Sequence, residues 1–209
     1  MIPKERLSRY LAECPLVAII RGVTPDDAEA IGRAILAAGI RIIEVPLNSP
    51  NPLASIRKLA DALDGEALVG AGTVLTVEDV HQVRGAGGAL IVSPNTDPEV
   101  IATTVGTGMA SCPGYFTPTE AFTALRAGAD ALKLFPAEGA SPAVVKGQRA
   151  VLPKDVPLLV VGGIAPDNMA PWREAGADGF GLGSGLYKPG QSADVTAARA
   201  KAYVEGVRG

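Results

Sequence analysis

Residues 129–138 read ADALKLFPAE, an apolar run with one lysine in its middle. In an extended chain Lys133 faces the opposite side from Leu132 and Leu134, and Pro136 ends the run. A buried ammonium is costly unless it is paired or neutral, and desolvation favours the neutral amine, which condenses with ketones. The segment alone leaves two interpretations open: a nucleophilic lysine in a closed sheet, or an edge-strand lysine that reaches water.

The residues that precede this run indicate the fold, because they recur later in the chain. RAGAD at residues 126–130 and EAGAD at residues 174–178 each lead from a helical pattern into an apolar run. Such runs, rich in Val, Ile and Leu, recur every ~20–27 residues, which is the length of a strand plus a helix. The expected strands are Leu16–Arg21, Arg41–Val45, Ala67–Gly70, Ala89–Ser93, Met109–Cys112, Asp130–Phe135, Val156–Val161 and Gly179–Gly183. Eight units predict an α/β fold, a (β/α)8 TIM barrel, preceded by an amphipathic N-terminal helix over Met1–Cys14.

The connections carry prolines and glycines where such a barrel needs them. Most strands are followed by a proline at an expected helix start, where its missing N–H costs nothing. These pairs are Thr24-Pro25, Ser49-Pro50, Asp97-Pro98, Thr117-Pro118, Ser141-Pro142 and Ala165-Pro166. Glycines are expected to mark the returns from helix to strand. They are Gly39, Gly65, Gly88, Gly108, Gly128 and Gly176.

Composition limits the classes of function. The chain has 209 residues, 47% of them hydrophobic, which predicts one domain over residues 1–209. A net charge of −3, one Trp, four Tyr and four Phe argue against a nucleic-acid partner. Cys14 and Cys112 form neither a metal-ligand spacing nor a disulfide framework. We expect no metal, no cofactor, no membrane span and a cytoplasmic location.

In a barrel of this kind the active site lies at the carboxyl ends of the strands. Glu44 comes late in the second expected strand, where alternation places Ile42 and Glu44 inside the barrel and Ile43 and Val45 toward the helices. An interior carboxylate needs a partner or a chemical role. Its side chain is expected to converge with Lys133, either as a catalytic pair or as a purely structural salt bridge.

Two further polar residues close expected strands. Arg21 ends the first strand, where a guanidinium suits a carboxylate or phosphate. The alternative is a rim arginine paired with Asp26 or Asp27. Thr73 follows the third strand and could bind a small carboxylate or simply cap a turn. His81, the only histidine, falls on an expected polar helix face, which argues against a histidine-centred triad.

Glycine pairs after the last two strands predict a phosphate site. Val161-Gly162-Gly163-Ile164 follows the seventh strand, and Gly181-Leu182-Gly183-Ser184-Gly185 follows the eighth. Barrel phosphate sites recur in these two loops, where backbone N–H groups approach the anion. Simple tight turns are the alternative for each pair taken alone.

Several segments, taken in order, resemble the class I 2-keto-3-deoxy-6-phosphogluconate (KDPG) aldolase family. They are Ile43–Val45, Val69–Leu75, Ser93-Pro94, Lys133–Glu138, Gly162–Ile164 and Gly183-Ser184, and the match runs from about Pro15 to Lys188. The resemblance implies a (β/α)8 barrel, usually trimeric, that cleaves a phosphorylated 2-keto-3-deoxy sugar acid to pyruvate and D-glyceraldehyde 3-phosphate through a lysine Schiff base. By this match Lys133 is the Schiff-base lysine and Glu44 the proton shuttle, Thr73 and Pro94 line the pyruvate end, and Gly162, Gly163, Gly183 and Ser184 bind the phosphate.

Two departures from the gluconate enzymes point to a sister group. Those enzymes usually carry an arginine four residues after the glutamate, where this chain has Asn48, and an apolar residue where it has Arg21. They usually carry threonine before the Gly-Gly pair, where this chain has Val161. Both changes resemble the 2-dehydro-3-deoxy-6-phosphogalactonate (KDPGal) aldolases, which act on the C4 epimer in galactonate catabolism. The alternatives are a KDPG or 4-hydroxy-2-oxoglutarate aldolase, another phosphate-binding isomerase or synthase, and a non-catalytic sugar-phosphate barrel.

Overall fold

The structure, a computed structural model, describes residues 1–208. Its strands, buried along their length, are β1 (Leu16–Ile19), β2 (Ile42–Pro46), β3 (Leu68–Gly72), β4 (Leu90–Val92), β5 (Ala110–Cys112), β6 (Gly114–Tyr115), β7 (Leu132–Leu134), β8 (Leu158–Val161) and β9 (Gly179–Leu182). Its helices are α1 (Pro3–Glu13), α2 (Pro25–Ala37), α3 (Pro52–Ala62), α4 (Val77–Gly85), α5 (Pro98–Gly106), α6 (Pro118–Arg126), α7 (Pro142–Arg149), α8 (Ala170–Glu174) and α9 (Ala193–Arg208), with a short 3-10 turn η1 (Ala137–Gly139).

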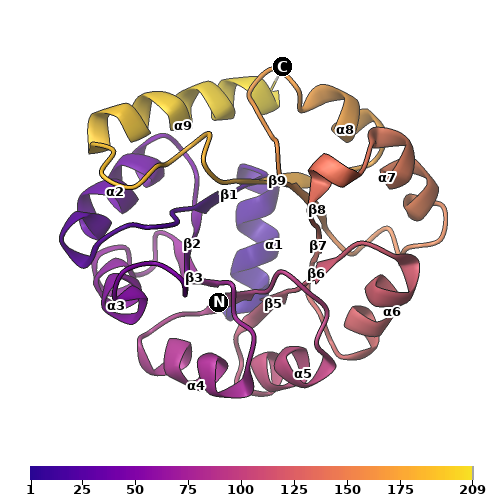
Figure 1. The fold of residues 1–209 in the computed structure, drawn as a ribbon, viewed down its shortest axis with the longest axis horizontal. Helices are drawn as coiled ribbons and strands as arrows, with labels where there is room; N and C mark the ends of the chain where they lie inside the picture. Colours follow the sequence, from indigo (N-terminus) through magenta and orange to yellow (C-terminus); the bar gives the residue numbers. More distant parts are fainter. Residues whose placement is uncertain (209) are drawn as a thin grey trace.

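The strands form one parallel sheet that curls into a barrel. Their order is β5-β4-β3-β2-β1-β9-β8-β7-β6, and helices α2 to α9 surround the ring (Figure 1). The sheet closes through the chain itself, since the amides of Ala131 and Lys133 donate to the carbonyls of Ser111 and Pro113. The predicted (β/α)8 barrel with an N-terminal helix is confirmed.

The fifth position of the barrel differs from the prediction, because two short strands occupy it. Pro113 separates β5 from β6. Proline has no N–H to donate to the ladder, so pairing is interrupted there. β5 then pairs with β4, and β6 pairs with β7.

Alternation along the strands separates two apolar cores. Ile43 and Val45 belong to the outer cluster between sheet and helices, whereas Ile42 belongs to an inner cluster within the barrel. Leu132 and Leu134 also face the outer cluster. The expected orientation of the second strand is therefore confirmed, and Lys133 projects inward for the same reason.

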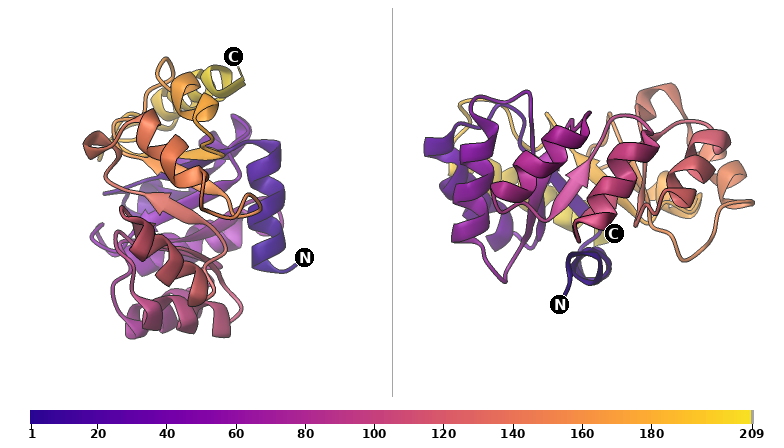
Figure 2. Two further views of the ribbon diagram at one scale, coloured as in Figure 1. Left: turned by 90° about the vertical axis from the view of Figure 1, so that its right-hand side faces the viewer. Right: turned by 90° about the horizontal axis from the view of Figure 1, so that it is seen from below.

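Helix α1 lies across one end of the barrel, outside the ring of strands (Figure 2). Seen down the barrel it crosses the centre of the ring (Figure 1). Its apolar face enters the inner cluster through Leu7, Tyr10 and Leu11. Helix α1 does not cover the opposite end of the barrel, where the strands finish and where the active site is expected.

Four of the six predicted helix starts are confirmed, and two are wrong. Helix α3 begins at Pro52 after Asn51, because the hydroxyl of Ser49 accepts a hydrogen bond from the amide of Gly22 (2.9 Å) instead of capping a helix. Pro166 also starts no helix, since the Asn168 side chain folds residues 163–168 into a turn before α8.

One predicted return glycine is also displaced. The left-handed residue after α4 is Gly87, with φ +87°, rather than Gly88. The other five predicted return glycines all have positive φ.

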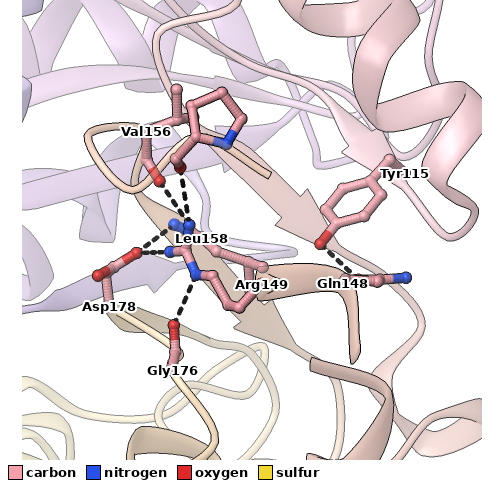
Figure 3. A network of polar contacts seen from close by, with 8 residues as sticks. Tyr115, Gln148, Arg149, Val156, Leu158, Gly176 and Asp178 are labelled. Carbon is pink, nitrogen blue, oxygen red and sulfur yellow. Dashed lines mark hydrogen bonds and ion pairs between the residues drawn. The ribbon is translucent and has the colours of Figure 1, made fainter. Parts of the chain in front are cut away.

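The aspartates of the two repeated GAD segments accept hydrogen bonds that join neighbouring strands at their amino ends. Asp130 accepts a hydrogen bond from the amide of Ser111, and Asp178 accepts one from the amide of Leu158. Asp178 also pairs with Arg149, whose guanidinium donates to three backbone carbonyls, among them that of Gly176 (Figure 3). The repeat thus has a structural role, which the sequence pattern did not reveal.

Candidate active site

A cavity of about 430 Å³ opens where the strands end. All ten of the side chains and loop residues proposed from the sequence line it. They are Arg21, Glu44, Thr73, Pro94, Lys133, Val161, Gly162, Gly163, Gly183 and Ser184. Residues from seven separate strands or their following loops therefore meet in one place, as the barrel interpretation requires.

Lys133 lies at the bottom of this cavity and is only 7% exposed. Its Nζ atom lies 4.8 Å from the centre of the Phe135 ring. Burial lowers the pKa of Lys133 below its ordinary value, and Arg21 lowers it further, while Glu44 opposes both. An amine held this way has a larger neutral fraction than a surface lysine, which suits nucleophilic attack.

Glu44 projects from β2 toward the same point and is 2% exposed. Within residues 1–208 its Oε2 atom has no hydrogen-bond partner. Burial raises the pKa of Glu44 to about 7, although Lys133 and Arg21 both favour the charged form. A carboxyl group with a pKa near neutrality can both accept and donate a proton.

A glycine makes room for this carboxyl group. A Cβ atom at Gly72, in β3, would lie less than 3.0 Å from both oxygens of Glu44. Gly72 therefore fixes where the carboxyl group can lie. This explains one glycine of the Gly70–Thr73 segment in terms of the site.

Arg21 is held by the neighbouring loop. Its guanidinium donates to Oδ1 of Asn48, and the amide of Gly22 donates to the hydroxyl of Ser49. Two of the three positions at which the sequence departs from the gluconate pattern, Arg21 and Asn48, are thus in direct contact. Within the described residues Arg21 pairs with neither Asp26 nor Asp27, so the rim-pair alternative is wrong.

Thr73 has a left-handed backbone, with φ +56°. This conformation is rare for a β-branched residue, and such strain gathers at functional sites. The cap of α4 is Thr76, whose hydroxyl accepts from the amide of Asp79 (3.1 Å). Thr73 is therefore not the cap of this helix, and it lines the cavity together with Pro94.

The glycine loops form the far side of the cavity. Gly162 and Gly163 both have positive φ, at 119° and 64°. After β9, a single helical turn begins at Gly183, whose carbonyl accepts from the amide of Leu186 (2.9 Å). The first amides of such a turn have no partner within it, so the amide of Ser184 is free to face an anion.

Other groups considered from the sequence lie elsewhere. His81 is exposed on α4. Cys112 is buried inside the barrel, where burial raises the pKa of its thiol to about 12. In the part of the chain that the structure describes, no three His, Cys, Asp or Glu residues gather as a metal site. None of the described helices is long and apolar enough to cross a membrane.

Comparison with known proteins agrees with this geometry. The family model "KDPG and KHG aldolase" matches residues 7–200. The chain belongs to this aldolase family. Its members are class I aldolases, so the resemblance noted from the sequence is confirmed.

Individual relatives of this aldolase cover nearly the whole chain. The 2-dehydro-3-deoxy-6-phosphogalactonate aldolase of Escherichia coli K12 is 49% identical over 200 residues, 96% of this chain and 98% of the relative. A solved structure described as native KDPGal matches with a TM-score of 0.91 at 50% identity, covering 93% of this chain and 94% of that one. A designed cube-shaped protein cage built by fusing symmetric oligomeric domains matches with a TM-score of 0.92 at 50% identity, covering 94% and 73%.

Three polar side chains of the aldolase cavity were not proposed as site residues from the sequence. Lys188 lies on the same loop as Ser184, Glu138 lies against Gly162 and Gly163, and Tyr187 lines the wall. Lys188 and Tyr187 follow the second glycine pair closely, which is a signal that could have found them. Glu138 ends the quoted strand segment, but nothing local indicates that its carboxylate folds back over the Gly-Gly loop.

Proposed function

We propose that this aldolase cleaves 2-dehydro-3-deoxy-6-phosphogalactonate to pyruvate and D-glyceraldehyde 3-phosphate, with Lys133 as the Schiff-base residue. The observation that carries the proposal is the shared cavity in which Lys133 and Glu44 lie together, between Arg21 on one side and the glycine loops on the other. Arg21 can bind a carboxylate and the glycine loops can bind a phosphate, with the nucleophile Lys133 between them. This arrangement matches a substrate that has a carboxylate at one end and a phosphate at the other.

The reaction begins with attack of the neutral Lys133 amine on the C2 ketone. The carbinolamine that forms loses water to give a protonated Schiff base. As the C4 hydroxyl gives its proton to Glu44, the C3–C4 bond breaks and its electron pair moves into the iminium, which leaves an enamine of pyruvate. D-Glyceraldehyde 3-phosphate leaves, Glu44 returns the proton to C3 of the enamine, and addition of water to the resulting Schiff base releases pyruvate and restores the amine.

The remaining cavity residues bind and orient the substrate. Arg21 holds the C1 carboxylate, and Thr73 and Pro94 line the pyruvate end. The amides of the Gly162-Gly163 and Gly183-Ser184 loops hold the distal phosphate.

Two observations support the galactonate epimer as the substrate: the identity of residue Val161 and the similarity to galactonate-type relatives. Val161 lies at the cavity wall, where the gluconate enzymes usually carry a threonine. An apolar side chain there removes a hydroxyl partner for the substrate's C4 hydroxyl, and unpaired polar groups discriminate strongly between substrates. The 49% identity to a 2-dehydro-3-deoxy-6-phosphogalactonate aldolase supports the same choice.

Borohydride trapping tests the mechanism. Reduction in the presence of pyruvate is expected to add one pyruvate-derived group to Lys133 and to abolish activity, while a Lys133→Ala variant is not labelled. Lys188→Ala, which removes the other lysine of the cavity, is expected to be labelled like the unaltered enzyme. Absence of an adduct, or loss of turnover with EDTA, would refute the Schiff-base assignment.

Cleavage of the two C4 epimers, measured side by side, tests the substrate. We expect a higher kcat/KM for the galactonate epimer. A preference for the gluconate epimer would assign the chain to KDPG cleavage instead.

We also propose a homotrimer in the cytoplasm. The family resemblance supports a trimer, and a relative of similar fold serves as an oligomeric domain in a designed cage. Phe116 and Val144 are exposed apolar side chains that a neighbouring copy could cover. Light scattering with size-exclusion chromatography measures the mass directly, and a monomeric mass would refute the trimer. Cell fractionation tests the location.

A further inference from the structure

A small void lies under the two charged groups, on the side away from the cavity mouth. Its volume is about 10 Å³, close to the space one water molecule needs. Glu44 and Lys133 line it together with Cys112 and apolar side chains such as Leu90 and Leu159. Water that entered this void would reach the catalytic pair from behind.

Helix α1 supplies the floor of the void. Leu7 lines it and is 1% exposed. Within residues 1–208 it is the only side chain of α1 that does so, although Tyr10 and Leu11 belong to the same inner cluster. The N-terminal helix therefore touches the space beneath the lysine through one leucine.

Polar contacts fasten α1 to the rim of the barrel. Lys4 pairs with Asp130 (3.0 Å), and the hydroxyl of Tyr10 donates to the carbonyl of Gly65 (3.1 Å). At the far end of the helix, Glu13 pairs with Arg41 (3.2 Å), which also lies over the Tyr10 ring. These contacts come from both ends of the helix, so α1 is held across the opening rather than at one point (Figure 2).

We propose that Leu7 is a positioning residue of the aldolase reaction: through it, α1 seals the barrel floor and keeps water away from Lys133 and Glu44. This inference rests on the proposed Schiff-base function. Leu7 lies outside the cavity that binds the substrate. It acts by excluding water from the void beneath the Lys133 amine.

The direction of the effect follows from what surrounds the amine. Lys133 is faced by Glu44 from β2, by Cys112 from β5 and by Arg21 from the end of β1, with the Phe135 ring beside it. Burial is the largest cause of the lowered pKa of Lys133 and of the raised pKa of Glu44. Water admitted through the floor would reverse both shifts, so a larger fraction of the amine would be protonated at neutral pH.

The matched pair Leu7→Val and Leu7→Thr tests this, because the two replacements have nearly the same shape and differ in polarity. The measurement is the pH dependence of kcat/KM and of the rate at which borohydride traps pyruvate on the full-length enzyme. The trapping rate reports the free amine of Lys133, so we expect its acidic limb in Leu7→Thr to lie roughly one pH unit higher than in Leu7→Val, a loss of about tenfold in trapping rate below that limb.

The pair Leu11→Val and Leu11→Thr serves as a control for damage to the helix. Leu11 lies in the same helix and inner cluster but does not line the void. These variants are expected to lower Tm without moving the limb. The inference would be overturned if the acidic limbs of the two Leu7 variants coincided. It would also be overturned if the limbs of Leu11→Val and Leu11→Thr differed as much as those of the Leu7 pair. Failure of the unaltered enzyme to trap pyruvate would instead refute the proposed function.

Discussion

Replacing Gly72 with alanine tests whether Glu44 acts from the position that the structure gives it. A Cβ atom at Gly72 would lie less than 3.0 Å from Oε1, Oε2 and Cδ of Glu44, closer than carbon approaches its neighbours in folded proteins. Gly72 lies in an extended strand, which alanine adopts without strain. The added methyl group therefore has one main effect, which is to push the carboxyl group of Glu44 aside by roughly 1 Å.

A displacement of this size is expected to slow the reaction. Moving a catalytic group by about 1 Å can cost about 10²-fold in rate. We expect kcat to fall about 30- to 100-fold in Gly72→Ala, with a stability loss of about 1–3 kcal/mol from overpacking. Lys133 remains in place, so borohydride should still attach pyruvate to it.

The assay is steady-state cleavage at several pH values, with thermal unfolding to show that the variant is folded. Gly85→Ala is the matched control, because a Cβ atom there meets nothing within 4 Å. Glu44→Gln gives the rate expected when the proton relay is lost altogether. A folded Gly72→Ala enzyme with kcat within about threefold of the unaltered enzyme would refute the placement of Glu44 as the proton relay.

Three further predictions follow from the site and its frame. Burial raises the pKa of Glu44 from 4.5 to about 7, so its contribution to the free energy of unfolding is full below pH 4.5 and is lost, by about 3 kcal/mol, as pH rises to about 7. Urea titrations should show that Glu44→Gln lacks this decline, and equal slopes for both proteins would contradict it. Asn48→Ala should raise KM for pyruvate in the condensation direction about 3- to 10-fold with a smaller change in kcat, because it frees the Arg21 guanidinium; an unchanged KM would exclude this positioning role. Arg149→Ala should lower the free energy of unfolding by about 2–3 kcal/mol, measured by urea denaturation, because it removes the ion pair with Asp178 and the donors to three backbone carbonyls, while kcat of the folded enzyme stays the same; a stability change under about 1 kcal/mol would contradict this.

The local pattern of the sequence determined the barrel and the inward direction of its two central charged groups. Strand and helix periods depend on residues that are close in the chain, so eight repeats of an apolar run and a helical pattern were sufficient to predict the architecture. The same alternation predicted that Glu44 and Lys133 point inward. The family resemblance, rather than periodicity, supplied the catalytic roles proposed for them.

Contacts between distant segments were decided only when the barrel closed. The break at Pro113, the contact of Arg21 with Asn48 and the seating of the Glu44 carboxyl group over Gly72 join segments that no local period relates. The sequence predicted an amphipathic N-terminal helix but not where its apolar face would pack. Its placement beneath Lys133 depends on closure of the strands, because only a closed ring has a floor for Leu7 to cover.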